Sequence, residues 1–319
     1  VTTRYFGGGT PSLYAPAALK GLLNHAAQLF DCSGAAETTL EANPDDLTGD
    51  YLAGLREAGI DRLSIGIQSF DDDCLKLMNR RHTAAQAAEA VRAAQRAGFG
   101  NLTVDLIFGV PGFGGDTLRR SLDAALSLGV QHISAYHLTV EPDTAFGRRA
   151  ARGEFRVVEE EVSEEEFLTV HQTLTAAGFE HYEVSNYALP GFRARHNASY
   201  WHGTKYLGIG PAAHSFDGEE RHWNACSVEK YIAGAPAGKE VLTQRDRFNE
   251  YVMTALRTAE GIDLEEAAAR FGAKRLARMQ EEAAPFLRSG TLRIDRGRMA
   301  LPPEKFLISD AVIGALFET

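Results

Sequence analysis

One short junction occurs four times before Glu180 and constrains the fold more than any other feature of the sequence. Each copy has helix-forming residues, one glycine and then an apolar residue, and the glycines are Gly59, Gly98, Gly129 and Gly178. A glycine at this place can adopt the left-handed conformation that ends a helix, and the apolar residue then begins a strand. Strands that alternate with helices form right-handed crossovers and a parallel sheet. The chain is therefore expected to be an α/β protein, folded as a barrel or part of one.

The strands and helices between these junctions can be placed from their periodicity. Residues 62–68 alternate cleanly, with Leu63, Ile65 and Ile67 on one face, as expected of a strand. In barrels of this type, the functional residues lie at the C-terminal ends of the strands. The expected strands are 1–6, 37–43, 62–68, 102–108, 131–140 and 180–187, and the expected helices are 16–30, 48–58, 71–79, 84–97, 117–128 and 162–177.

The sequence pattern changes near Leu242, and we expect two domains there, 1–240 and 241–319. The second domain should contain short helices, a hairpin at 291–301 and a final helix, an arrangement that resembles a winged helix. Before it, residues 188–222 are rich in glycine, histidine and aromatic residues and show little periodicity. A loop of that length is usually functional, so we expect ligand contacts from it.

Composition excludes several classes of function. The net charge of -10 argues against a nucleic-acid-binding protein, because such proteins need basic surface. No apolar run is long enough for an integral membrane segment. The three cysteines, Cys32, Cys74 and Cys226, are far apart and make neither a disulfide framework nor a CxxC-type metal site. Unpaired cysteines favour a reducing, cytoplasmic location.

Candidate ligand-binding residues follow several of the expected strands. Gly7 to Gly9 end the first strand, and without Cβ atoms they would let a ligand lie against the backbone, although a flexible turn is the simpler interpretation. Carboxylates at strand ends can accept ribose hydroxyls or an ammonium group, and a guanidinium can bind a carboxylate. Each residue also has a structural alternative: Arg80 and Glu41 could form an ion pair, and Asp105 could cap a helix. The polar residues concerned are Glu41, Gln68, Arg80 and Asp105.

A set of motifs in this order resembles the oxygen-independent coproporphyrinogen III oxidase family of radical S-adenosylmethionine proteins. The motifs are YFGGGTPS, TLEANP, SIGIQSF, NRRHT, DLIFGVPG, HNASYW and YLGIGPAAHSF. The resemblance covers essentially the whole chain. It implies an incomplete (β/α)6 barrel, here without its first strand, followed by a small helical domain.

The resemblance also implies two cofactors. S-adenosylmethionine would be bound by Gly8, Gly9, Thr10, Glu41, Gln68, Arg80 and Asp105, with Leu138 and His214 near its adenosine or the substrate. The family's 4Fe–4S cluster is held by three thiolates in a CxxxCxxC motif, which we expect upstream of Val1. Cys32 and Cys74 do not match that spacing, so we expect no cluster ligand in this chain.

Two functions compete within this family. One branch consists of oxidases, which decarboxylate coproporphyrinogen III to protoporphyrinogen IX, and the other of haem chaperones. The HNASYW motif resembles the chaperone branch, as does 183–187 (EVSNY). The resemblance implies a haem or porphyrin ligand and haem-accepting apoproteins, and it is compatible with peripheral membrane contact. His196 is then the candidate iron ligand, with Asn197, Tyr200 and Trp201 beside the haem.

Two alternatives to these assignments stay open. His196 and Asn197 could simply anchor a loop through hydrogen bonds. A barrel enzyme with an unrelated small ligand would explain the glycine loop, but not the agreement of all the motifs. The sequence does not indicate an oligomeric state.

Overall fold

The computed structural model describes residues 1–236 and 238–319. It contains two compact units, Val1–His196 and Asn197–Thr319. The division falls inside one short helix, α8 (Arg195–Trp201). The boundary expected at residue 240 rested on a change of sequence pattern and stays a prediction.

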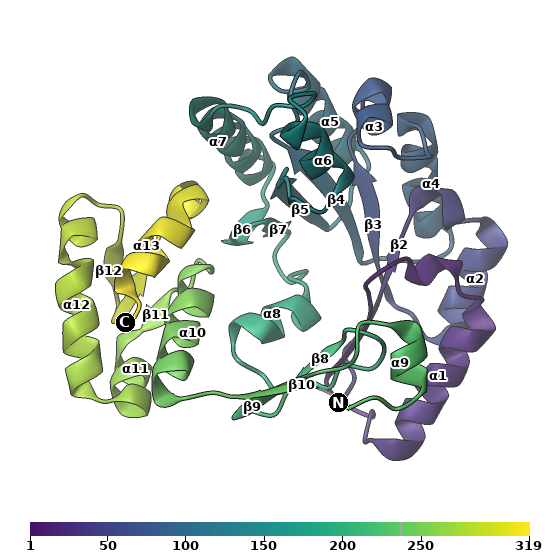
Figure 1. Cartoon of the computed structure of the whole chain (residues 1–319). Helices are drawn as coiled ribbons and strands as arrows, with labels where there is room; N and C mark the ends of the chain where they lie inside the picture. The colour runs from purple at the N-terminus through teal and green to yellow at the C-terminus, as the bar shows by residue number, and fades with distance from the viewer. Residues whose placement is uncertain (237) are drawn as a thin grey trace. The chain divides into compact units, whose positions relative to one another are not determined.

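The first unit is built on a seven-stranded sheet with the order β1-β2-β3-β4-β5-β7-β6. Its first five strands run parallel, and the sheet curls with helices on its outer side, as Figure 1 shows. The expected α/β part-barrel is thus confirmed. The parallel strands are β1 (Thr3–Phe6), β2 (Glu37–Ala42), β3 (Arg62–Gln68), β4 (Leu102–Phe108) and β5 (His132–His137).

The helices between these strands begin and end close to the predicted residues. Thr48 caps the second helix by accepting a hydrogen bond from the backbone of Tyr51, and Gly59 ends it with a φ of 91°. Leu63, Ile65 and Ile67 of β3 are fully buried, as their alternation predicts. The helices are α1 (Pro16–Leu29), α2 (Gly49–Ala58), α3 (Asp72–Leu77), α4 (Ala84–Arg96), α5 (Asp116–Ser127), α6 (Ala145–Ala151) and α7 (Glu160–Ala176).

The last expected strand, 180–187, is wrong as a single parallel strand. The chain forms a hairpin instead, with β6 (Glu180–Glu183) and β7 (Asn186–Ala188) antiparallel to each other. The turn is held because the backbone N–H of Ser185 donates to the Glu183 carboxylate, and the Ser185 carbonyl accepts from Ala135 in β5. β7 therefore joins the sheet antiparallel to β5.

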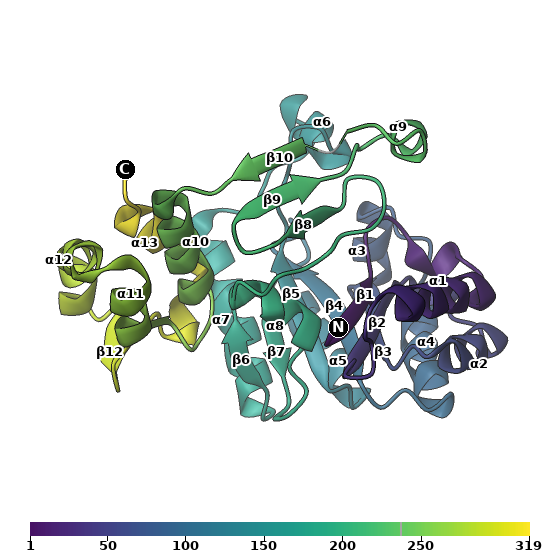
Figure 2. The same ribbon diagram turned by 90° about the horizontal axis from the view of Figure 1, so that it is seen from below.

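The segment 188–222 also has more regular structure than its sequence predicts. It includes α8, β8 (His214–Phe216) and most of β9 (Glu220–Trp223). β8, β9 and β10 (Gly238–Val241) form an antiparallel sheet, visible side by side in Figure 2, and α9 (Val228–Ile232) lies between β9 and β10 in the sequence. The strands were not recognised because each is only three or four residues long, too short for periodicity to show.

The rest of the second unit agrees with the expected helices and hairpin. β12 (Arg293–Asp295) and β13 (Arg298–Ala300) pair around the predicted turn, and β11 (Ile262–Asp263) completes the sheet. No helix in the described part of the chain is long and apolar enough to cross a membrane. The helices of this part are α10 (Gln244–Leu256), α11 (Leu264–Phe271), α12 (Ala273–Arg288) and α13 (Ser309–Leu316).

Candidate functional site

A cavity of about 180 Å³ lies at the C-terminal ends of the parallel strands in the first unit. The loop after β1 and the ends of β2, β3 and β4 all contribute to it, because parallel strands bring their carboxyl ends to one edge of the sheet. The expectation that the strand-end polar residues share one cavity is confirmed. Six residues predicted to contact S-adenosylmethionine line it, namely Gly9, Thr10, Glu41, Gln68, Arg80 and Asp105.

The glycine loop is closed onto Glu41. The Tyr5 hydroxyl donates a 2.6 Å hydrogen bond to one carboxylate oxygen of Glu41, and the backbone N–H of Gly8 donates to the other at 3.1 Å. Gly8 and Gly9 have φ values of 78° and 64°, which side chains rarely adopt. Burial and the Glu41 carboxylate raise the pKa of Tyr5 far above its usual value, so the phenol stays a donor. The loop is therefore held against Glu41 at one wall of the cavity.

Arg80 lines the cavity and donates hydrogen bonds to the ends of two neighbouring strands. Its Nη2 donates to the Gly66 carbonyl at 2.7 Å and to Asn43 Oδ1 at 3.0 Å. A side chain at Gly66 would crowd this group, since a Cβ there would lie 3.2 Å from Arg80 Nη2. The guanidinium is thus held by Asn43 and Gly66, and the suggested ion pair with Glu41 is wrong. Gln68 lies beside it with a φ of 74°, an unusual conformation for a residue other than glycine.

Asp105 supplies a second carboxylate. It lies inside β4, well before α5 begins at Asp116, so the alternative that it caps a helix is wrong. Ser64 Oγ donates to both of its oxygens at 3.3 Å. Burial, with a contribution from the Glu41 charge, raises the pKa of Asp105 to about 6. This carboxyl group therefore changes its charge close to neutral pH.

Three other predicted cofactor residues do not line this cavity. Gly8 adjoins it through the hydrogen bond to Glu41. Leu138 follows β5, where its N–H donates to the Phe108 carbonyl, and His214 belongs to β8 in the second unit. Ser12 and Asn43, which were not among the predicted ligands, line the cavity instead. For Asn43 the signal is Pro44, since proline holds the preceding residue extended.

His196, the candidate iron ligand, is held against β1 in the first unit. Its Nδ1 lies 2.9 Å from Thr3 Oγ1, and its ring stacks on Tyr5 with centroids 4.8 Å apart. Glu37 accepts hydrogen bonds from the backbone N–H groups of Arg195 and His196, which fixes the start of α8. Burial lowers the pKa of His196, so its imidazole is neutral. The anchoring contacts considered as an alternative are thus present.

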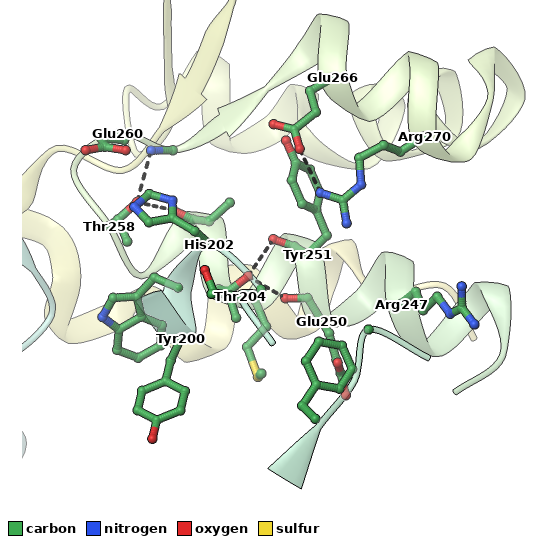
Figure 3. Close-up of a pocket in the computed structure, with 18 of the residues that line it drawn as sticks. Tyr200, His202, Thr204, Arg247, Glu250, Tyr251, Thr258, Glu260, Glu266 and Arg270 are labelled. Atoms are coloured by element: carbon green, nitrogen blue, oxygen red, sulfur yellow. Dashed lines mark hydrogen bonds and ion pairs between the residues drawn. The ribbon is translucent and has the colours of Figure 1, made fainter. Parts of the chain in front are cut away.

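A second cavity, of about 610 Å³, lies in the second unit and is drawn in Figure 3. Tyr200 and Trp201 of the HNASYW motif line it, together with His202, whereas Asn197 does not. Its remaining walls come from β8, β9, α10, α11 and β13. Tyr200 and Trp201 were predicted ligand contacts, whereas the lining residues from α10 to β13 were not.

The residues present do not fit a 4Fe–4S cluster. The described part of the chain contains no group of three histidine, cysteine, aspartate or glutamate residues that could hold a metal ion. Cys32, Cys74 and Cys226 are unpaired, and burial raises the pKa of Cys74 to about 11. Cluster binding requires thiolates, which a buried thiol of this kind does not provide. We therefore assign no cluster chemistry to these residues.

Comparison with known proteins identifies the family. Residues 1–125 match the Radical SAM superfamily, and residues 242–308 match the HemN C-terminal domain. The chain is 39% identical to the Heme chaperone HemW of Mycobacterium tuberculosis (strain H37Rv), over 99% of this chain and 80% of the relative. It is 32% identical to the Heme chaperone HemW of Lactococcus lactis, over 97% of this chain and 83% of the relative.

The fold agrees with that relationship. The coproporphyrinogen III oxidase HemN of Escherichia coli superimposes with a TM-score of 0.84, over 99% of this chain and 78% of that one, at 21% sequence identity. That identity supports a common fold and no more. Membership of the radical SAM superfamily implies S-adenosylmethionine and a 4Fe–4S cluster, and the cavity at the strand ends has the polar residues for the first of these. On sequence and fold together, the chain belongs to the HemW family of radical SAM proteins.

Proposed function

We propose that this protein is a haem chaperone, which binds haem and S-adenosylmethionine and delivers haem to apoproteins. The relatives that match along most of its length are named heme chaperones. The observation that carries the proposal is the way His196 is held. Histidines that ligate metals are usually oriented by a hydrogen bond to the other ring nitrogen, and Nδ1 of the neutral His196 ring contacts Thr3 in this way. A haem-accepting partner and a cytoplasmic location stay predictions.

The contact with Thr3 would set the tautomer of His196. When Nδ1 carries the hydrogen, it donates to Thr3 Oγ1, and Nε2 is the unprotonated nitrogen that can coordinate iron. The low pKa keeps this form present at neutral pH, since the cationic ring cannot bind a metal. The same contacts that anchor α8 therefore also prepare His196 as a ligand.

The cavity at the strand ends is the proposed site for S-adenosylmethionine. The backbone of Gly9 and Thr10 would hold its methionine end, and Arg80 would meet its carboxylate. Glu41 and Asp105 are placed to accept hydrogen bonds from an ammonium group or ribose hydroxyls, and Gln68 can donate or accept. In this superfamily, S-adenosylmethionine supplies radical chemistry when it is bound to a reduced cluster.

The proposal is tested by titrating hemin into the wild type, His196→Ala and His25→Ala, and following the Soret band. His25 is an exposed histidine on α1 and serves as the matched control. We expect the His196 variant to lose affinity and to shift the band, while the control behaves as the wild type. Equal affinity and an equal spectrum in all three proteins would remove His196 as the ligand, and absence of hemin binding by the wild type would reject the chaperone function.

The oxidase function is the second candidate, and the shared fold with HemN is the observation in its favour. The two are separated by supplying coproporphyrinogen III, S-adenosylmethionine and a reductant to the full-length protein under anaerobic conditions. Rapid formation of protoporphyrinogen IX would support the oxidase. We expect none, because the HNASYW segment resembles the chaperone branch.

A further inference from the structure

The cavity of the second unit has the size of a small-molecule site. Its volume of about 610 Å³ lies within the range of about 300–1,000 Å³ that is usual for ligand pockets. Figure 3 shows Tyr200 and His202 on one side and Tyr251, Glu266 and Arg270 on another. The residues come from segments far apart in the sequence, so the cavity is a product of the tertiary fold.

One wall of this cavity is aromatic. Tyr200 packs edge-on to Tyr206 with centroids 4.8 Å apart, and Tyr206 lies 6.2 Å from Phe216. Trp201 and Tyr251 add two more rings to the lining. Rings of this kind provide a large apolar surface with some polar edges, which suits a flat, conjugated ligand.

Arginines supply the positive charge, and three of the four that line the cavity already have carboxylate partners. Arg221 pairs with Glu250 at 2.9 Å. Arg270 pairs with Glu266 at 2.7 Å, and Arg298 pairs with Asp263 at 2.9 Å. These pairs neutralise one another and are structural in this state.

Arg247 differs from the other three. It lies on α10 and is half-buried, and its Nε is buried without a hydrogen-bond partner among the described residues. The Nε1–H of Trp201, also on the cavity wall, is a second buried donor without an acceptor in the described chain. Buried donors are nearly always paired in folded proteins, so two on one cavity indicate a missing acceptor.

We infer that this cavity binds a planar, carboxylate-bearing ligand, a porphyrin, with the aromatic wall against the macrocycle and Arg247 on a propionate. An arginine binds a carboxylate with two parallel hydrogen bonds, and Nε of Arg247 is a donor without a partner among the described residues. The inference rests on the proposed function, because haem is the ligand of this chemistry that the chaperone would carry. It assigns ligand contacts to α10, outside the HNASYW motif.

The test uses free-base protoporphyrin IX, which has no iron and needs no axial histidine, and its dimethyl ester, which has no carboxylates. Binding to the wild type, Arg247→Gln and Arg245→Gln is followed by porphyrin fluorescence. Arg245 is exposed on the same helix and is the matched control. Because a charge-assisted hydrogen bond to a propionate is lost, we expect Arg247→Gln to bind the diacid about 10-fold more weakly.

The ester provides the second arm of the test. It should bind the wild type about as weakly as the diacid binds Arg247→Gln, and the variant should no longer distinguish the two ligands. Arg247→Lys, which keeps the charge, should recover part of the affinity and guards against a misfolded Gln variant. If the wild type binds hemin and the free base, yet Arg247→Gln matches it for both, the inference is wrong while the chaperone proposal stands. If the wild type binds neither porphyrin, both are wrong.

Discussion

Thr3 Oγ1 lies 2.9 Å from Nδ1 of His196, although the two residues are 193 positions apart in the chain. The contact joins the first strand of the sheet to the first turn of α8. Glu37, in the neighbouring strand β2, accepts two backbone N–H groups of the same turn. The start of the HNASYW motif is therefore fixed by the barrel itself.

Removing the Thr3 hydroxyl tests whether this contact orients the histidine. Contacts that orient metal ligands are typically worth 10–100-fold in affinity, so we expect Thr3→Val to weaken hemin binding by about 10-fold. The Soret position should be kept, because the ligand itself is unchanged. Thr2→Val, at an exposed neighbouring position, is the control. Full affinity in Thr3→Val would mean that the contact only anchors α8.

Asp105 should make S-adenosylmethionine binding depend on pH. Its pKa of about 6 is raised by burial, so the carboxylate that accepts hydrogen bonds forms only as the pH rises from about 5 to 7. We expect affinity for S-adenosylmethionine to increase over that window in calorimetric titrations, and Asp105→Asn to bind weakly with a flat profile. Asp123→Asn, at an exposed position on α5, should keep the wild-type profile. A pH dependence retained in Asp105→Asn would assign it to another group.

Glu166 supports the loop after β4 from α7. Its Oε2 accepts a 2.7 Å hydrogen bond from the backbone N–H of Gly109, and the side chain is 4% exposed. Burial raises the pKa of this carboxyl group. Replacing it by leucine leaves a buried N–H unpaired, which costs about 1–3 kcal/mol of unfolding free energy and should speed hydrogen exchange at Gly109. Glu166→Gln keeps an acceptor for the Gly109 N–H and should lose less unfolding free energy than the leucine variant. An equal loss in the two variants would show that this hydrogen bond contributes little to stability.

His181 should make the first unit sensitive to acid. Burial, with His171 beside it, lowers its pKa from 6.5 to about 3. Between pH 6.5 and about 3, His181 is protonated in the unfolded state and neutral in the folded state. The unfolding free energy therefore falls as the pH drops below 6.5. Between pH 6.5 and 5 the loss is about 2 kcal/mol.

Urea unfolding at pH 7.5 and pH 5 measures this effect. His181→Gln should lose less stability between the two values than the wild type, although it starts from a lower value because the ring stacks on Tyr187 at 4.0 Å. His25→Gln, on the exposed face of α1, should lose as much unfolding free energy between pH 7.5 and pH 5 as the wild type. An unchanged pH dependence in His181→Gln would exclude this histidine as the cause.

A polypeptide of residues 1–319 should show no iron–sulfur absorbance after anaerobic reconstitution with iron and sulfide. Cys74 lies in α3, Cys32 and Cys226 lie in separate loops, and no metal-binding group of three occurs among the described residues. A stable cluster lost on replacing any of these cysteines by alanine would contradict the expectation.

Local sequence determined most elements of the first unit and several residues of its cavity. Thr48 and Gly59 act through hydrogen bonds within one turn of their helix, so a short window of sequence suffices to predict them. Glu41, Gln68 and Asp105 could be placed together without coordinates, because parallel strands necessarily bring their carboxyl ends to one edge.

Only the tertiary structure decided the contacts that join distant segments. The start of α8 is capped by Glu37, which lies 158 residues before Arg195, and no local sequence pattern predicts such a cap. The hairpin after Glu183 forms because Ser185 and β7 pair with β5, which a window of sequence does not contain. Arg80 bonds to Asn43 and Gly66 rather than to Glu41, and Arg247 lines the same cavity as Tyr200 and Trp201, because packing brings together residues in a way that sequence separation does not encode.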